Sequence, residues 1–169
     1  MIASFPHTSL PEVGEEPTYN ELVAIRNAIK QNYASIPTQL GGGAYGYLGG
    51  LLSAEEYELL APGTPFTAPP HPGPQPVIEH ATTAVVSSNT LRVFSEATRE
   101  WREWSNLERA SKKQLQAALP KALLASQMCP NRGLNYLSMQ AVLAQLFLDW
   151  GYMSQQDLVA NRHRLNEEW

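Results

Sequence analysis

Residues 41–50 read GGGAYGYLGG and separate a helix-forming segment from a proline-rich one. Six of these ten residues are glycine, which permits positive φ angles and close approach of neighbouring backbone. Three large apolar or aromatic residues stand among the glycines, Tyr45, Tyr47 and Leu48. We expect these side chains to anchor an irregular loop by packing.

The same string contains the Gly-x-Gly-x-x-Gly spacing of dinucleotide-binding turns. That spacing binds a pyrophosphate only where a strand precedes it and a helix starts within it. Pro37 interrupts any preceding strand, and Gly49 and Gly50 would break a following helix. The sequence therefore favours a structural loop over a nucleotide site.

Two helices are expected around this loop, each opened by a capping box. The boxes are formed by Thr18 with Glu21 and by Ser53 with Glu56. The first helix carries apolar residues at helical spacing as far as Pro37, and the second ends before Pro62. The spaced residues of the first helix are Leu22, Ile25, Ile29 and Tyr33. Residues 1–17, with three prolines, are predicted to form an extended arm.

Seven of the 13 prolines fall between Pro62 and Pro76. Such a run cannot pair in a sheet or continue a helix. We expect a stiff connector that packs over the helical body or joins two parts of the molecule in a fixed way. Residues 36–52 and 62–87 are predicted to be largely irregular.

The second half of the chain has the composition of a helical protein. The predicted helices run from Ser88 or Asn89 to Pro120, over 121–128, over 136–150 and over 155–168. The fold class expected is all-α, with an irregular Gly/Pro-rich amino-terminal half. The expected divisions are the arm, an amino-terminal helical pair over 18–87 and a carboxy-terminal helical domain over 88–169.

Phe94, Trp101 and Trp104 form an aromatic stripe on the long predicted helix. Their spacing is that of any buried helix face, so they pack in the core or, as the alternative, form a subunit interface. The charged residues Glu108 and Lys112 fall near the same side of the helix and weaken the apolar character of that side in its middle part. For self-association we single out four apolar residues after the stripe, Trp150, Leu158, Leu165 and Trp169.

Composition excludes several classes of function. Among 169 residues Cys129 is the only cysteine and the four histidines are scattered, which argues against a disulfide, a zinc site or another metal centre. No protease, hydrolase or phosphate-loop string occurs, so we expect no enzyme and no cofactor. Without an apolar run of membrane length or a signal peptide, the chain is predicted to be soluble and intracellular.

Net charge is −4, but it is unevenly distributed, with −6 on residues 1–87 and +2 on residues 88–169. On the long predicted helix a basic stripe lies away from the tryptophans, made of Arg92, Arg99, Arg102, Arg109 and Lys113. A solvated face is one interpretation. The alternative is a weak contact with the phosphate backbone of RNA, which depends on charge rather than on base-reading geometry.

Taken together, the glycine loop, the Glu-Tyr helix after it and the run His71-Pro72-Gly73-Pro74 resemble the Gag polyproteins of copia-type LTR retrotransposons of the marine and environmental branch. The likeness continues in Lys112-Lys113-Gln114-Leu115 and in Leu143–Trp150 with the Gly-Tyr turn after it. Trp150 departs from the family, which commonly has tyrosine there, but keeps an aromatic anchor.

This resemblance implies a capsid: a cytoplasmic helical protein whose copies assemble into a virus-like particle around retroelement RNA. The sequence has no zinc knuckle, protease or polymerase segment, so we expect a capsid fragment, a short Gag product, or a viral or host-adopted relative. The alternative is a non-assembling helical interaction module that docks one partner. Its proline-rich segment lacks the flanking basic residue that usual Pro-x-x-Pro readers require.

Overall fold

A computed structural model describes residues 10–78, 83–152, 158–159 and 162–163 of the chain. The elements in chain order are α1 (Tyr19–Ser35), the 3₁₀ helices η2 (Leu40–Gly42) and η3 (Leu48–Gly50), α2 (Ala54–Leu60), α3 (Ala84–Ala118), the 3₁₀ helix η4 (Lys121–Gln127) and α4 (Met139–Trp150). Within these residues the only β pairing is an isolated bridge between Cys129 and Gly133. The predicted all-α class is therefore confirmed for the described part.

Both capping boxes form as predicted. The backbone N–H of Glu21 donates to Thr18 Oγ1 at 3.3 Å, and the N–H of Thr18 donates to a Glu21 carboxylate oxygen at 2.8 Å. Ser53 and Glu56 make the same reciprocal pair at 3.1 and 2.8 Å. Because each box satisfies two backbone donors of the first turn, it fixes where its helix starts.

Two predicted helix starts differ from the structure by a few residues, and one predicted helical segment is of the 3₁₀ type. Residues 84–87 are helical rather than irregular, because the Thr83 carbonyl already accepts from the N–H of Ser87 at 3.0 Å. The segment over 121–128 is a 3₁₀ helix, and the helix expected from residue 136 begins at Met139, where the Ser138 hydroxyl caps it. The last predicted helix, over 155–168, lies largely outside the described residues.

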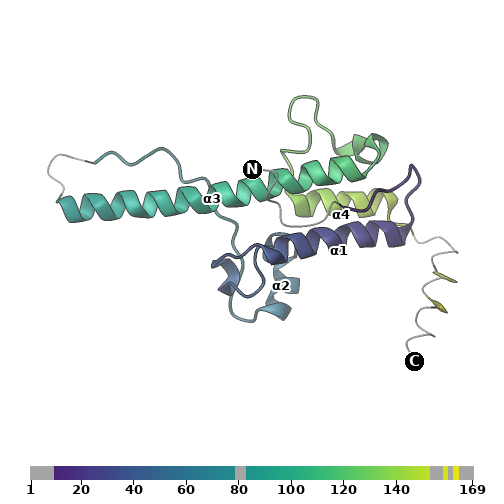
Figure 1. Ribbon diagram of the computed structural model, residues 1–169, viewed down its shortest axis with the longest axis horizontal. Helices are drawn as coiled ribbons and strands as arrows, with labels where there is room; N and C mark the ends of the chain where they lie inside the picture. The colour runs from purple at the N-terminus through teal and green to yellow at the C-terminus, as the bar shows by residue number, and fades with distance from the viewer. Residues whose placement is uncertain (1–9, 79–82, 153–157, 160–161, 164–169) are drawn as a thin grey trace.

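One hydrophobic core joins both halves of the chain. In Figure 1, α1 and α4 lie side by side against the second half of α3. The buried core residues range from Leu10 and Val13 of the arm through Ile25 and Leu115 to Leu146. The division that we placed at residue 88 therefore does not separate two cores. A smaller cluster, around Tyr57, holds α2 to the glycine loop.

The glycine loop packs closely, as its composition predicts. Gly46 has φ 53° and is buried, and the N–H of the next residue, Tyr47, donates to the Tyr33 carbonyl at the end of α1 at 2.9 Å. A Cβ at Gly50 would lie 2.2 Å from the Trp104 ring. Glycine at these positions thus allows the loop to lie directly on α1 and α3.

Helix α3 is far longer than the core that it enters. Its 35 residues correspond to a rod of about 50 Å. All of its buried residues lie at or after Leu107, and the half before them projects from the body (Figure 1). We refer to residues 84–103 as the projecting half of α3.

The proline-rich segment runs back along this projecting half (Figure 1). Its Phe66 ring packs edge-on against Tyr47 and Tyr57, and the His71 ring lies 4.3 Å from the Trp101 ring between centroids. The expectation that this segment packs over the helical body is therefore correct, and the contact is made to α3.

Candidate assembly surfaces

A buried polar cluster holds the three main helices together and thereby fixes the direction of the projecting half of α3 relative to the core. Glu108 and Lys112 form an ion pair of 2.7 Å. The Glu108 carboxylate also accepts from the Tyr33 hydroxyl of α1 at 3.2 Å and from the N–H of Met139, the first residue of α4, at 3.0 Å. Lys112 donates to the Leu137 carbonyl at 2.5 Å.

Two electrostatic effects favour this arrangement. A carboxylate at the amino terminus of α4 complements the positive end of the helix dipole. Burial, together with the Glu108 charge, raises the pKa of Tyr33 well above its usual value, so its hydroxyl remains a donor. Glu108 and Lys112 therefore do not weaken this face of α3, as their charges suggested, but satisfy each other within it.

The three stripe aromatics have separate environments. Trp104 packs on the core beside Tyr33, Tyr47 and Phe66, with ring centroids 5.9 to 6.1 Å apart. Trp101 is half-buried beneath His71. Phe94, also half-buried, lines a groove. Of the two interpretations, core packing is correct for Trp104, whereas Phe94 lies at an accessible surface.

The first accessible surface is the projecting half of α3. Exposed apolar side chains occur along it, with Val85 at 80% and Val93 at 52% exposure. An open groove of about 780 Å³ lies on it, lined chiefly by Leu91, Phe94, Thr98, Arg99, Arg102 and Gln75. The groove therefore combines an apolar floor with two guanidinium groups.

The five basic residues of the stripe are all exposed but are not equivalent. Arg92 pairs with Glu96 at 2.8 Å, and Arg99 approaches Glu103 at 4.0 Å. Arg102, Arg109 and Lys113 have no ion pair with any residue that the structure describes. These three carry the uncompensated charge of the stripe.

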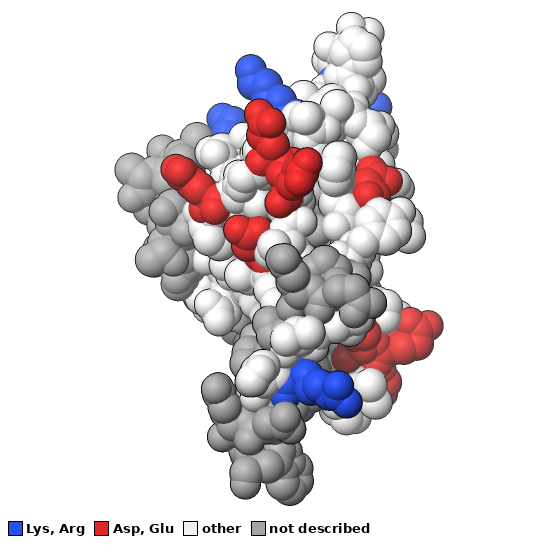
Figure 2. Space-filling model, turned by 90° about the vertical axis from the view of Figure 1, so that its right-hand side faces the viewer, with Lys and Arg blue, Asp and Glu red and all other residues white. Residues whose placement is uncertain are grey.

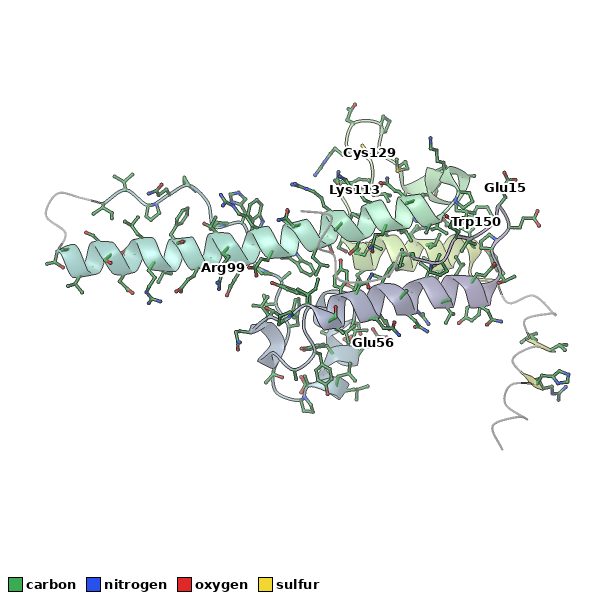
Figure 3. All side chains as sticks on the ribbon, viewed as in Figure 1. Glu15, Glu56, Arg99, Lys113, Cys129 and Trp150 are labelled. Carbon is green, nitrogen blue, oxygen red and sulfur yellow. The ribbon has the colours of Figure 1, made fainter. Side chains whose placement is uncertain are left out.

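The second accessible surface lies at the other end of the molecule, where α4 ends. Leu148, Trp150 and Tyr152 are 70%, 37% and 76% exposed, and Leu158 is exposed as well. Figure 3 shows Trp150 at this end and Arg99 on the projecting half of α3. Leu165 and Trp169, the other predicted self-association residues, lie outside the described residues.

Acidic side chains lie at the same end of the molecule as the second surface. Glu12, Glu15, Glu16 and Glu21, from the arm and the start of α1, are all exposed. The end-on view of Figure 2 shows acidic side chains gathered on this end, with basic ones towards its margins. The two ends of the molecule thus differ in charge as well as in shape.

Sequence reasoning missed most of the apolar residues of these surfaces. Val93 shares the inward stripe of α3, but the described core residues of α1 and α4 pack on a later part of the helix, at and after Trp104. Leu148 lies on the outer side of α4 and is 70% exposed, although it stands in the apolar run 146–148, so no pattern in the sequence indicated its exposure. The Glu108–Lys112 pair did have a signal, because acidic and basic residues at i and i+4 attract each other on a helix.

No protein-family model matches this sequence, and no curated protein or solved structure shows significant similarity to it. Among the described residues, no cluster of three or more His, Cys, Asp or Glu side chains has the arrangement of a metal site. None of the described helices has the length and apolar character needed to cross a membrane.

Proposed function

We propose that this protein is a structural, capsid-type protein related to Gag, whose copies assemble into a particle around retroelement RNA in the cytoplasm. The observation that carries the proposal is the pair of exposed apolar surfaces at opposite ends of one elongated helical subunit. A subunit with one self-complementary patch stops at a dimer, whereas two different surfaces allow growth into a ring, tube or shell.

The sequence resemblance supports the same assignment. The glycine loop that carries it anchors α1 to α3 and leads into the proline-rich segment that lies on the projecting half of α3. Part of the family pattern therefore lies where the chain contacts the projecting helix. A protein that builds a lattice depends on a fixed direction of this helix.

RNA contact is the second part of the proposal, and it is assigned to Arg109 and Lys113, the residues of the stripe that have no described ion pair and lie outside the groove. These side chains are exposed and carry charge that no described neighbour compensates. Lysine and arginine that neutralise phosphates release counterions, so the contact weakens steeply with salt. The net charge of −4 keeps such binding weak and non-specific.

Assembly is tested on the purified chain by light scattering with size-exclusion chromatography, at rising protein concentration and at two salt concentrations. We expect species far larger than the 18.7 kDa subunit, visible as closed or tubular particles by negative-stain electron microscopy. A monomer that persists at millimolar concentration would contradict the proposal and favour the non-assembling interaction module.

RNA contact is tested by Arg109→Glu together with Lys113→Glu. We expect less co-purifying nucleic acid and a salt dependence of binding reduced by about one unit of log–log slope per lost contact. The matched control is Lys121→Glu with Arg132→Glu, which makes the same charge change at exposed positions off the stripe. An equal loss of nucleic acid in both variants would show a general charge effect and no specific contact.

A further inference from the structure

The projecting half of α3 has too little packing of its own for a helix of this length. Among the described residues, the proline-rich segment contacts it through His71 and Tyr47 donates to Glu103 at its base, whereas all of the buried residues of α3 lie beyond it. Isolated helices gain most of their stability from an apolar face packed on a partner. Exposed Val86, Leu91 and Val93 are therefore suited to contact a further surface.

The charged side chains that line the groove on this half favour an acidic binding partner. Arg99 and Arg102 line the groove, against a single carboxylate, Glu103. Glu103 also accepts a hydrogen bond from the Tyr47 hydroxyl at 3.4 Å, and Arg99 is 4.0 Å from it in an exposed pair. So loose a contact leaves the Arg99 guanidinium able to bind another carboxylate. An acidic partner with apolar side chains would fit.

The opposite end of the same molecule combines acidic and apolar side chains in this way. Figure 3 shows Glu15, before α1, at the same end of the molecule as Trp150, the last residue of α4. The ring of Tyr19, the first residue of α1, lies 6.0 Å from the Phe147 ring of α4, so the exposed carboxylates of residues 12–21 lie at the same end of the molecule as the exposed side chains of Leu148 and Tyr152. An aromatic and aliphatic centre with a charged rim is the usual composition of a protein interface.

We propose that the acidic, apolar end of one copy, around Glu15, Glu16, Leu148 and Tyr152, docks into the Arg99–Arg102 groove of the next copy, head to tail. This inference rests on the proposed function, since it names the contact through which the subunits associate. The two surfaces differ and lie at opposite ends, so the contact is heterologous and repeats from copy to copy. Two acidic ends would repel each other, which disfavours an isologous dimer through that end.

The test uses two charge-reversal variants of the full chain. The groove variant is Arg99→Glu with Arg102→Glu, and the end variant is Glu15→Lys with Glu16→Lys; all four side chains are exposed. Each variant alone should associate about 100-fold more weakly than wild type, because like charges then face each other. Mixed in equal amounts, the two should assemble again, since each groove then meets an end of opposite charge.

A single chain with all four reversals should assemble by itself for the same reason, and this recovery shows that the separate variants are folded. Lys121→Glu with Arg132→Glu is the control and should assemble like wild type.

Groove and end variants that assemble normally would overturn the inference while the proposed function stands. Loss of nucleic acid from the groove variant with assembly intact would also overturn it and assign the groove to RNA. Monomeric wild type would refute both proposals.

Discussion

Glu108 and Lys112 lie one turn apart on α3 and form an ion pair of 2.7 Å whose side chains are only 11% and 7% exposed. Each also binds a group from outside α3: Glu108 contacts Tyr33 and the first N–H of α4, and Lys112 contacts the carbonyl of Leu137. The pair is thus the point at which α1, α3 and the start of α4 are fixed together.

Glu108→Gln should therefore lower the free energy of unfolding by about 3–5 kcal/mol, because it leaves the Lys112 charge buried without its partner. The matched control is Glu96→Gln, which breaks an exposed i,i+4 pair on the same helix and should cost less than about 0.5 kcal/mol. Urea denaturation followed by circular dichroism measures both. Similar small losses would show that Glu108 is not needed to balance Lys112.

Gly46→Ala should be strongly destabilising. A Cβ there would lie 2.4 Å from the Ala34 carbonyl oxygen and 2.5 Å from that of Ile36, on a residue with φ 53°. Steric overlap and the left-handed backbone together should cost about 3 kcal/mol or more. Gly63→Ala is the control, with φ 72° but no atom within 4 Å, and should cost only about 1–2 kcal/mol. Equal melting temperatures of the Gly46→Ala and Gly63→Ala variants would contradict the close packing of Gly46 against the carbonyl oxygens.

Alkaline pH should unfold the protein in part through Tyr33. Burial raises the pKa of Tyr33 well above 10.0, so the folded state keeps a proton that the unfolded state loses near pH 10. The stabilisation is complete below about pH 10 and falls as pH rises above it.

Tyr33→Phe should accordingly lower stability by about 1 kcal/mol at pH 7, because a buried hydrogen bond is lost, but should flatten the decline above pH 10. Tyr57→Phe, at a tyrosine whose pKa burial also raises but less strongly, should flatten it less. Denaturation curves at pH 8 to 11 measure the slopes. A steeper decline of stability with pH in Tyr33→Phe than in wild type would show that Tyr33 does not cause the alkaline loss of stability.

Trp101→Ala should release the proline-rich segment from α3 without unfolding the core. An aromatic pair such as His71 with Trp101 contributes about 0.5–1.5 kcal/mol, which corresponds to roughly 2- to 10-fold faster cleavage of a locally opened segment. Limited thermolysis between Val77 and Ile78 reports this opening. Trp150→Ala, at the other end of the molecule, should leave the cleavage rate unchanged, and an equal rise in both would indicate general loosening.

The sequence by itself determined the local elements. Thr18 with Glu21 and Ser53 with Glu56 set two helix starts, because their hydrogen bonds span only three residues. Helical spacing likewise identified Leu22, Ile25 and Ile29 as an inward face, and all three are fully buried. Signals of this kind are local, so one sequence suffices to detect them.

Only the tertiary structure decided how these elements combine. Amphipathic spacing runs along most of α3, yet burial begins at Leu107, because α1 and α4 cover only that end. Phe94 and Trp104 belong to one stripe, but contact with Tyr33, Tyr47 and Phe66 places Trp104 alone on the core. Burial and pairing depend on residues distant in the chain, such as Tyr33 and Glu108, 75 positions apart, and no local pattern specifies that distance.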